Sequence, residues 1–281
     1  MRKYSNTDLW LRVILFFAIC VTLIFTFQVF AIPLARAVLN SGDALPLIFE
    51  VNLVRSMNGI VGVGLVYAFL KFDRRTLDIV GVSWEKKWGK EWILIGVPIT
   101  LAGWIPTVVI ELLFQIVDFP LLLDPLGIVL TFIITMFFIG FGEEILFRGY
   151  IQNVVETRYS FETGTLVSAF LFGTLHFLLI TPSQNINNMI AVSLSAFVIG
   201  IAFSYVYRIS SYNLILPTVI HGFWDFFLFI GSAEFFYEDP LKVLVEIIAS
   251  VVGAAIILGI VYYYWIRRLK PTQQVARSST V

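Results

Sequence analysis

Long apolar runs alternate with short polar stretches along the whole chain. A membrane-spanning helix needs about 20 apolar residues. Eight runs meet this requirement, at about 10–32, 47–70, 92–117, 125–150, 163–181, 188–208, 213–231 and 241–266. The pattern predicts an all-α fold, a polytopic integral membrane bundle of about eight transmembrane helices. We expect one membrane domain over 1–281, with a polar, disordered tail at 271–281.

Composition supports an integral membrane protein. Of the 281 residues, 59% are hydrophobic and 14% are charged, and the mean hydropathy is +0.90. A soluble domain has about 45–50% apolar and about 25% charged residues. The expected environment is therefore the lipid bilayer. The net charge of zero argues against nucleic-acid binding through a basic surface, so no nucleic-acid partner is expected. The single cysteine, Cys20, excludes an intrachain disulfide and a cysteine-based metal cluster.

Lysine and arginine are distributed unevenly between the loops. They gather at both ends of the chain and between the second and third runs, at 71–90. The alternate loops carry mainly aspartate and glutamate. Because cytoplasmic loops are enriched in basic residues, the pattern predicts a multi-pass protein with both termini cytoplasmic, in the cell membrane if the source is prokaryotic. The first run, at about 20 residues, is longer than a signal-peptide core of about 7–15 and is expected to be retained.

Ionisable residues interrupt the fourth run at Glu143, Glu144 and Arg148. Each costs about 2.5–3.5 kcal/mol to insert at the centre of a bilayer, so such residues need partners and mark functional sites. Glu144 and Arg148 are four residues apart on one helix face and are expected to form an ion pair. Glu143 lies about 100° around the helix and faces elsewhere. Gly140 and Gly142 would let a neighbouring helix or a substrate approach closely.

Both histidines of the chain, His176 and His221, lie in later apolar runs. If the chain turns at 159–160, Glu143 and His176 are equally far from the turn and lie at one depth in an antiparallel hairpin. His221 and Asp225 are four residues apart and share a helix face. The acids, the arginine and the histidines are therefore predicted to meet in one buried polar site. Other polar residues within the runs, such as the pair at 111 and 115, are expected to join helices.

Two kinds of hydrolytic chemistry suit such a cluster. A carboxylate and a histidine that hold a water can hydrolyse an amide by general base catalysis, and a second polar pair can stabilise the oxyanion. The same residue types suit a Zn²⁺ ion with an open coordination position. The ligands in that alternative are Glu143, His176, His221 and Asp225. The sequence contains no His-Glu-x-x-His, so it is not a zincin-type metalloprotease.

Three short motifs occur in this part of the chain. They are Glu143-Glu144-x-x-x-Arg148, Phe172-x-x-x-His176 and His221-x-x-x-Asp225. In order, spacing and membrane depth the set resembles the CPBP family, which contains the type II CAAX prenyl endopeptidases and the Abi-like bacteriocin-processing and immunity proteins. The family pattern ends in His-x-x-x-Asn or His-x-x-x-Asp. The resemblance covers about residues 120–232, which are expected to form the catalytic core.

The resemblance implies an intramembrane protease, either glutamate-dependent or a metallo-endopeptidase. It implies that Glu143 is the general base that activates water, with His176 helping to position that water. Glu144 would be the second carboxylate, and Arg148 and Phe172 would give structural support.

The resemblance also implies that His221 and Asp225 hold the oxyanion. An ionised aspartate accepts hydrogen bonds and donates none. Asp225 must therefore be protonated, orient His221 or ligate a metal. The sequence establishes no cofactor, and Zn²⁺ stays an alternative.

Three functions are compatible with these features. The first is hydrolysis of a peptide bond in a membrane-associated protein or peptide, prenylated CAAX-type proteins being one option. The second is a non-catalytic bacteriocin-immunity or binding module that retains the polar site. The third is an ion-coupled transporter, because intramembrane acids and histidines also mark ion pathways. The absence of an internal repeat disfavours the transporter.

Overall fold

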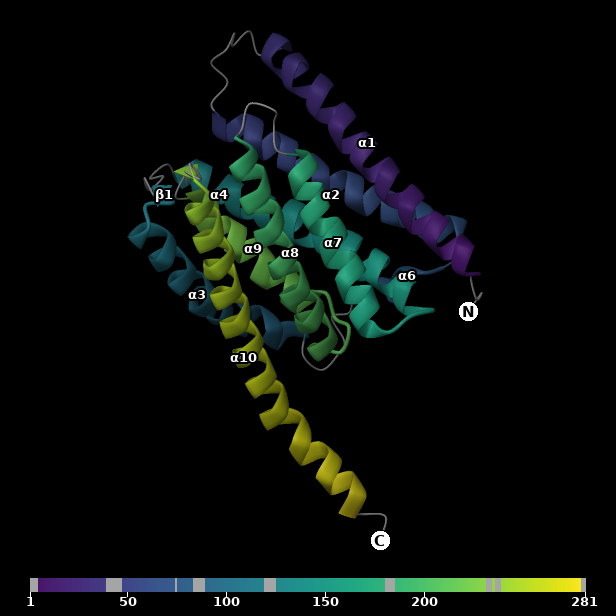
Figure 1. Cartoon of the computed structure of the whole chain (residues 1–281). Coiled ribbons are helices and arrows are strands. Elements are labelled where there is room, and N and C mark those ends of the chain that lie inside the picture. Colours follow the sequence, from purple (N-terminus) through teal and green to yellow (C-terminus); the bar gives the residue numbers. More distant parts are fainter. Residues whose placement is uncertain are drawn as a thin grey trace.

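The computed structural model describes residues 5–38, 47–73, 75–82, 89–118, 125–179, 185–230, 234–235 and 239–278. Within this part of the chain, eight long helices form the bundle, which confirms the all-helical fold (Figure 1). Seven of them are α1 (Asn6–Val38), α2 (Leu47–Phe72), α3 (Gly89–Leu113), α7 (Phe161–Leu179), α8 (Ile186–Ile209), α9 (Ile215–Ile230) and α10 (Pro240–Ser278).

The remaining long helix runs without a break over Pro125–Glu156. It is built from α4 (Pro125–Ile133), the π-helical segment η2 (Ile134–Gly140), α5 (Phe141–Glu144), the π-helical segment η3 (Ile145–Gln152) and α6 (Asn153–Glu156). π-helical turns within α-helices are rare and are frequent at functional sites. Here the two π segments flank the four residues of α5, which end at Glu143 and Glu144.

Six of the described helical segments are long and apolar enough to cross a membrane. These are Asn6–Phe30, Ile93–Leu113, Pro125–Glu156, Phe161–Leu178, Ile186–Ile209 and Pro240–Tyr264. Two shorter apolar segments, Gly59–Phe72 and Ile215–Ile230, belong to α2 and α9. The chain is therefore a multi-pass membrane protein, and the cytoplasmic location of both termini stays a prediction.

The third apolar run departs from the predicted helix at its end. Helix α3 stops at Leu113, and Gln115 adopts a left-handed conformation with φ 53°. The chain then forms strand β1 (Val117–Asp118), which pairs antiparallel with strand β2 (Glu234–Phe235). Glu111 interacts with Glu246 of α10, as expected for a polar residue that joins helices.

Helix packing places the continuous helix 125–156 inside the bundle, against α2 on one side and α9 on another. Helix α8 packs between α7 and α10, and α3 packs against α9 and α10. Figure 1 shows α1 along one side of the molecule and α10 continuing past the other helices. The short segment η1 (Leu77–Val80) contacts the continuous helix. Of the tail predicted to be disordered, 271–281, the part up to Ser278 belongs to α10, and 279–281 lie outside the described residues.

Candidate active site

Glu144 links its own helix to α9 through one carboxylate oxygen. Its Oε1 atom accepts a hydrogen bond from Arg148 Nη1 at 2.7 Å and lies 2.8 Å from His221 Nδ1. The ion pair with Arg148 confirms the prediction from the four-residue spacing. Because a carboxylate that is paired with a guanidinium can only accept, His221 must present its Nδ1–H to it. Glu144 therefore fixes the orientation of the His221 imidazole.

Arg148 is fully buried and has partners on two other helices. Its Nη2 donates a hydrogen bond of 3.0 Å to the carbonyl oxygen of Gly200 in α8. Its guanidinium lies 4.8 Å from the centre of the Phe172 ring and 5.3 Å from that of the Phe203 ring. Aromatic faces attract a buried cation, and the attraction grows when water is excluded. The guanidinium is thus held by a carboxylate, a carbonyl and two rings.

The second nitrogen of His221 faces the other two acids of the site. Nε2 lies 3.7 Å from Glu143 Oε2 and 3.7 Å from Asp225 Oδ2. Both separations exceed a direct hydrogen bond. The Glu143 and His221 side chains are 8% and 6% exposed, and that of Asp225 is 17% exposed. His221 therefore stands between a buried ion pair at Nδ1 and two carboxylates at Nε2.

Glycines set the distance between the helices that carry these groups. A Cβ on Gly140 would lie 2.8 Å from the Thr218 carbonyl oxygen and 2.9 Å from the Gly222 nitrogen. A Cβ on Gly222 would lie 2.6 Å from the Met136 sulfur. Gly142 meets Gly59 of α2 at an even closer backbone approach. The predicted close approach at Gly140 and Gly142 is therefore confirmed, and Gly140 and Gly222 bring α9 next to the continuous helix.

His176 lies on α7, where its Nδ1 is 2.9 Å from the carbonyl oxygen of Phe172. The His176 and Phe172 rings are 4.5 Å apart, and the Phe172 and His221 rings are 5.8 Å apart. One phenyl ring thus borders both imidazoles. The shared depth of His176 and Glu143 stays a prediction.

Sequence reasoning missed the contribution of α8. This helix supplies the Gly200 carbonyl and the Phe203 ring, which lies 5.0 Å from the His221 ring. Neither residue carries a charge or a known motif. The available signal was two small residues one turn apart in an apolar run, Gly200 and Ser204. The Ser204 hydroxyl donates a hydrogen bond of 3.0 Å to the Gly200 carbonyl oxygen.

The fit to a metal ion can be tested on the donor set. The described residues contain no group of three or more His, Cys, Asp or Glu side chains that could hold a metal ion. The geometry of the described residues therefore lends no support to the Zn²⁺ alternative with Glu143, His176, His221 and Asp225 as ligands.

Fold and site together define a multi-pass membrane protein with a buried centre of carboxylates and histidine between its helices. Such a centre contains the groups needed for general acid–base chemistry. Intramembrane ionisable residues of this kind mark functional sites.

A comparison with protein-family models identifies the class more closely. Residues 125–227 match the family described as Type II CAAX prenyl endopeptidase Rce1-like, and this part of the chain is a domain of that family. The matched range contains all three motifs and lies within the predicted core, 120–232. The family implies a protease that acts on protein or peptide substrates. Comparisons with curated proteins and with solved structures gave no match.

Proposed function

We propose that the chain is an intramembrane endopeptidase that hydrolyses a peptide bond in a membrane-associated protein or peptide. The observation that carries the proposal is the position of His221. Its imidazole is oriented at Nδ1 by the buried Glu144–Arg148 pair and faces Glu143 and Asp225 at Nε2. A carboxylate beside an oriented imidazole, inside an apolar bundle, supplies both a base and a site for a developing negative charge.

Glu143 is the general base in this proposal. Its carboxylate takes a proton from a water molecule as the water oxygen attacks the scissile carbonyl carbon. The same carboxyl group then gives the proton to the leaving amide nitrogen as the carbon–nitrogen bond breaks. By the family resemblance, His176 helps to hold the water; its imidazole borders the same Phe172 ring as His221.

His221 stabilises the oxyanion of the tetrahedral intermediate. In its protonated form the imidazole donates Nε2–H toward the substrate oxygen, while Glu144 accepts from Nδ1–H. Asp225 cannot donate when it is ionised; its carboxylate near Nε2 instead favours the charged imidazole electrostatically. Catalytic hydrogen bonds in unliganded sites are often long and tighten in the substrate complex. The 3.7 Å separations at Nε2 are compatible with such tightening.

Arg148 and Phe172 act as supports. Arg148 balances the charge of Glu144, and the Phe172 ring lies against the guanidinium and both imidazoles. The family name favours a prenylated CAAX-type protein as the substrate. A bacteriocin-type peptide is the alternative substrate, and a binding or immunity module is the alternative function.

The test uses the full chain in liposomes and measures release of a membrane-anchored peptide. We expect Glu143→Gln to lower turnover by about 10²–10⁴-fold, the usual contribution of a general base. The matched control is Glu162→Gln. It makes the same chemical change in a side chain that is 65% exposed and lies outside the site. Unchanged turnover in Glu143→Gln would remove Glu143 from the mechanism.

A second measurement separates catalysis from binding. We expect any cellular phenotype of the protein to be lost in both Glu143→Gln and His176→Asn while both variants remain folded in the membrane. Retention of the phenotype in both variants would favour the binding or immunity module.

A further inference from the structure

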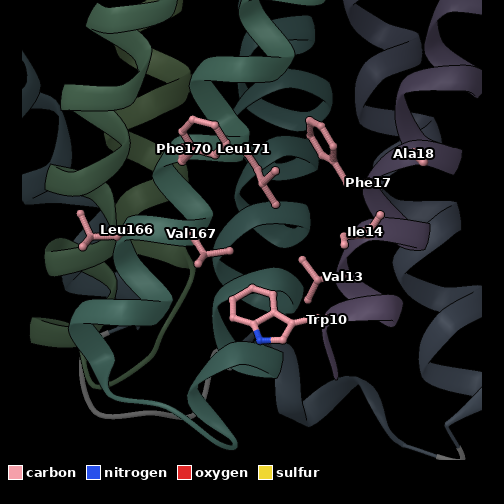
Figure 2. Close-up of a pocket in the computed structure, with 9 residues that line it drawn as sticks. All are labelled: Trp10, Val13, Ile14, Phe17, Ala18, Leu166, Val167, Phe170 and Leu171. Atoms are coloured by element: carbon pink, nitrogen blue, oxygen red, sulfur yellow. The ribbon is translucent and has the colours of Figure 1, made fainter. Parts of the chain in front are cut away.

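A groove runs along the outside of the bundle between α1 and α7 (Figure 2). Its volume is about 440 Å³, and every side chain that lines it is apolar or aromatic. Helix α1 contributes Trp10, Val13, Ile14, Phe17 and Ala18, and α7 contributes Leu166, Val167, Phe170 and Leu171. Ile14, Leu166 and Phe170 are 64%, 54% and 64% exposed. Both helices are candidate membrane spans, so the groove faces the hydrocarbon of the bilayer.

The length of the groove limits what it can hold. On α1 it extends from Trp10 to Ala18, which is about 12 Å at 1.5 Å per residue. The hydrocarbon core of a bilayer is about 30 Å thick, so one leaflet contributes about half of that. A partner transmembrane helix would need contact along most of the full thickness. The groove instead matches the depth that a lipid acyl chain reaches within one leaflet.

One end of the groove is polar and lies at the level where α1 and α7 both begin. Trp10 Nε1 donates a hydrogen bond of 3.1 Å to the Tyr159 hydroxyl, as expected for aromatic residues at a membrane–water interface. Next to this pair, Arg158 Nε donates a hydrogen bond of 2.9 Å to Asn6 Oδ1. Arg158 is exposed, and its bond to Asn6 uses only one of its five N–H donors.

Two acids also lie at this end, and other groups engage both. The Asp8 carboxylate, on the first turn of α1, accepts a hydrogen bond of 2.6 Å from the Ser5 hydroxyl. Glu162 lies on the first turn of α7, but its carboxylate is directed to Arg208, 3.8 Å away. The Ser160 hydroxyl accepts a hydrogen bond of 3.3 Å from the backbone N–H of Thr163 at the start of α7. The exposed guanidinium of Arg158 is the group at this end that favours a phosphate.

We propose that the α1–α7 groove binds one acyl chain of an anionic phospholipid whose phosphate contacts Arg158. The apolar walls supply the contact surface for the chain, and Trp10 closes the groove beneath the headgroup. Lipid is then a specific ligand at this position and not only a solvent. The inference does not depend on the proposed peptidase activity, because the groove lies on the outer face of α7 and shares no lining residue with the candidate active site.

The test uses the full chain purified in detergent with dioleoylphosphatidylglycerol and dioleoylphosphatidylcholine in equal amounts, and it counts the retained lipids by native mass spectrometry. We expect the wild type to retain one phosphatidylglycerol in preference to phosphatidylcholine. Arg158→Gln should weaken phosphatidylglycerol binding about five-fold, because one arginine near an anionic lipid contributes about that factor. Arg267→Gln, which removes another exposed arginine, is the control and should have no effect.

Filling the groove tests the acyl chain separately. Ala18→Trp should abolish the retained lipid, whereas Leu15→Trp should preserve it, since Leu15 is 50% exposed on α1 and does not line the groove. Equal retention of both lipids, or no effect of Arg158→Gln and Ala18→Trp, would overturn the proposal. A dimer that Ala18→Trp converts to a monomer would also overturn it, because a second copy would then be the occupant.

Discussion

Glu144 holds the buried charges of the site together, so Glu144→Gln tests the electrostatic reasoning directly. Its Oε1 lies 2.7 Å from Arg148 Nη1 and 2.8 Å from His221 Nδ1. The side chains of Glu144 and Arg148 have no exposed surface. Glutamine has the same shape and still offers a carbonyl oxygen, so the substitution removes the charge and little else.

Two physical effects predict different losses in the free energy of unfolding for this variant. A side-chain hydrogen bond between helices of a membrane protein contributes about 0.6 kcal/mol on average. A buried charge that loses its partner costs about 3–5 kcal/mol. An arginine at the bilayer centre carries an insertion cost of about 2.5–3.5 kcal/mol, which agrees with the larger value. Because the Glu143 carboxylate also interacts with Arg148, we expect the lower end of that range, about 3 kcal/mol.

The assay is equilibrium unfolding in mixed micelles, followed by tryptophan fluorescence. Glu162→Gln is the matched control: Glu162 and Arg208 are 3.8 Å apart with side chains 65% and 48% exposed, and such surface pairs contribute less than about 1 kcal/mol. The double variant Glu144→Leu/Arg148→Met should recover most of the lost stability, because it removes both buried charges. It should stay inactive, because His221 loses the acceptor at Nδ1. A loss in Glu144→Gln no larger than that in Glu162→Gln would refute the reasoning.

Three further predictions follow from other parts of the structure. Gly222→Ala should cost about 1–3 kcal/mol and lower turnover, because its Cβ would lie 2.6 Å from the Met136 sulfur; Gly64→Ala, with no atom within 4 Å of its Cβ, should instead be neutral or stabilise by about 0.5–1 kcal/mol in the same unfolding assay. Cleavage should persist with a metal chelator, because no described group of three ligands could hold a metal ion; loss of cleavage with recovery on adding Zn²⁺ would contradict this. Burial and the Glu156 carboxylate, which accepts a 3.0 Å hydrogen bond from the Tyr212 hydroxyl, raise the pKa of Tyr212 above 10.0. The stabilisation from a raised pKa is complete below the unfolded pKa and is lost as pH rises through the folded pKa, so wild type should lose a component of stability above about pH 10 that Tyr212→Phe lacks.

The helices could be predicted from the sequence because burial in lipid imposes a strong apolar signal over about 20 residues. The turn predicted at 159–160 lies between the end of α6 at Glu156 and the start of α7 at Phe161. The signal fails at the end of the third run. Residues Ile116 and Val117 are as apolar as the helix before them, but they extend into a strand after the left-handed Gln115. Hydropathy records burial and carries no information on backbone conformation.

Within the site, contacts along one helix were predictable and contacts between helices were not. The Glu144–Arg148 pair follows from the four-residue spacing alone. The bond from His221 to Glu144 depends on the position of α9 along the axis of the helix that contains α5. The close approach of Gly140 and Gly222 determines that position. The glycines predict that two helices cross closely, but they do not predict which residues face each other at the crossing.

The partner of Arg148 on α8 shows why charged residues alone do not predict every contact of an intramembrane site. A buried guanidinium has five N–H donors, and Glu144 cannot satisfy all of them. A second acid would have been visible in the sequence, but it would have added another buried charge at a cost of several kcal/mol. The Gly200 carbonyl accepts the second bond at no such cost, and it is accessible because the residue one turn further on, Ser204, is small. The helices that complete an intramembrane ionic site are therefore best sought among small residues in apolar runs, since those positions expose backbone oxygens.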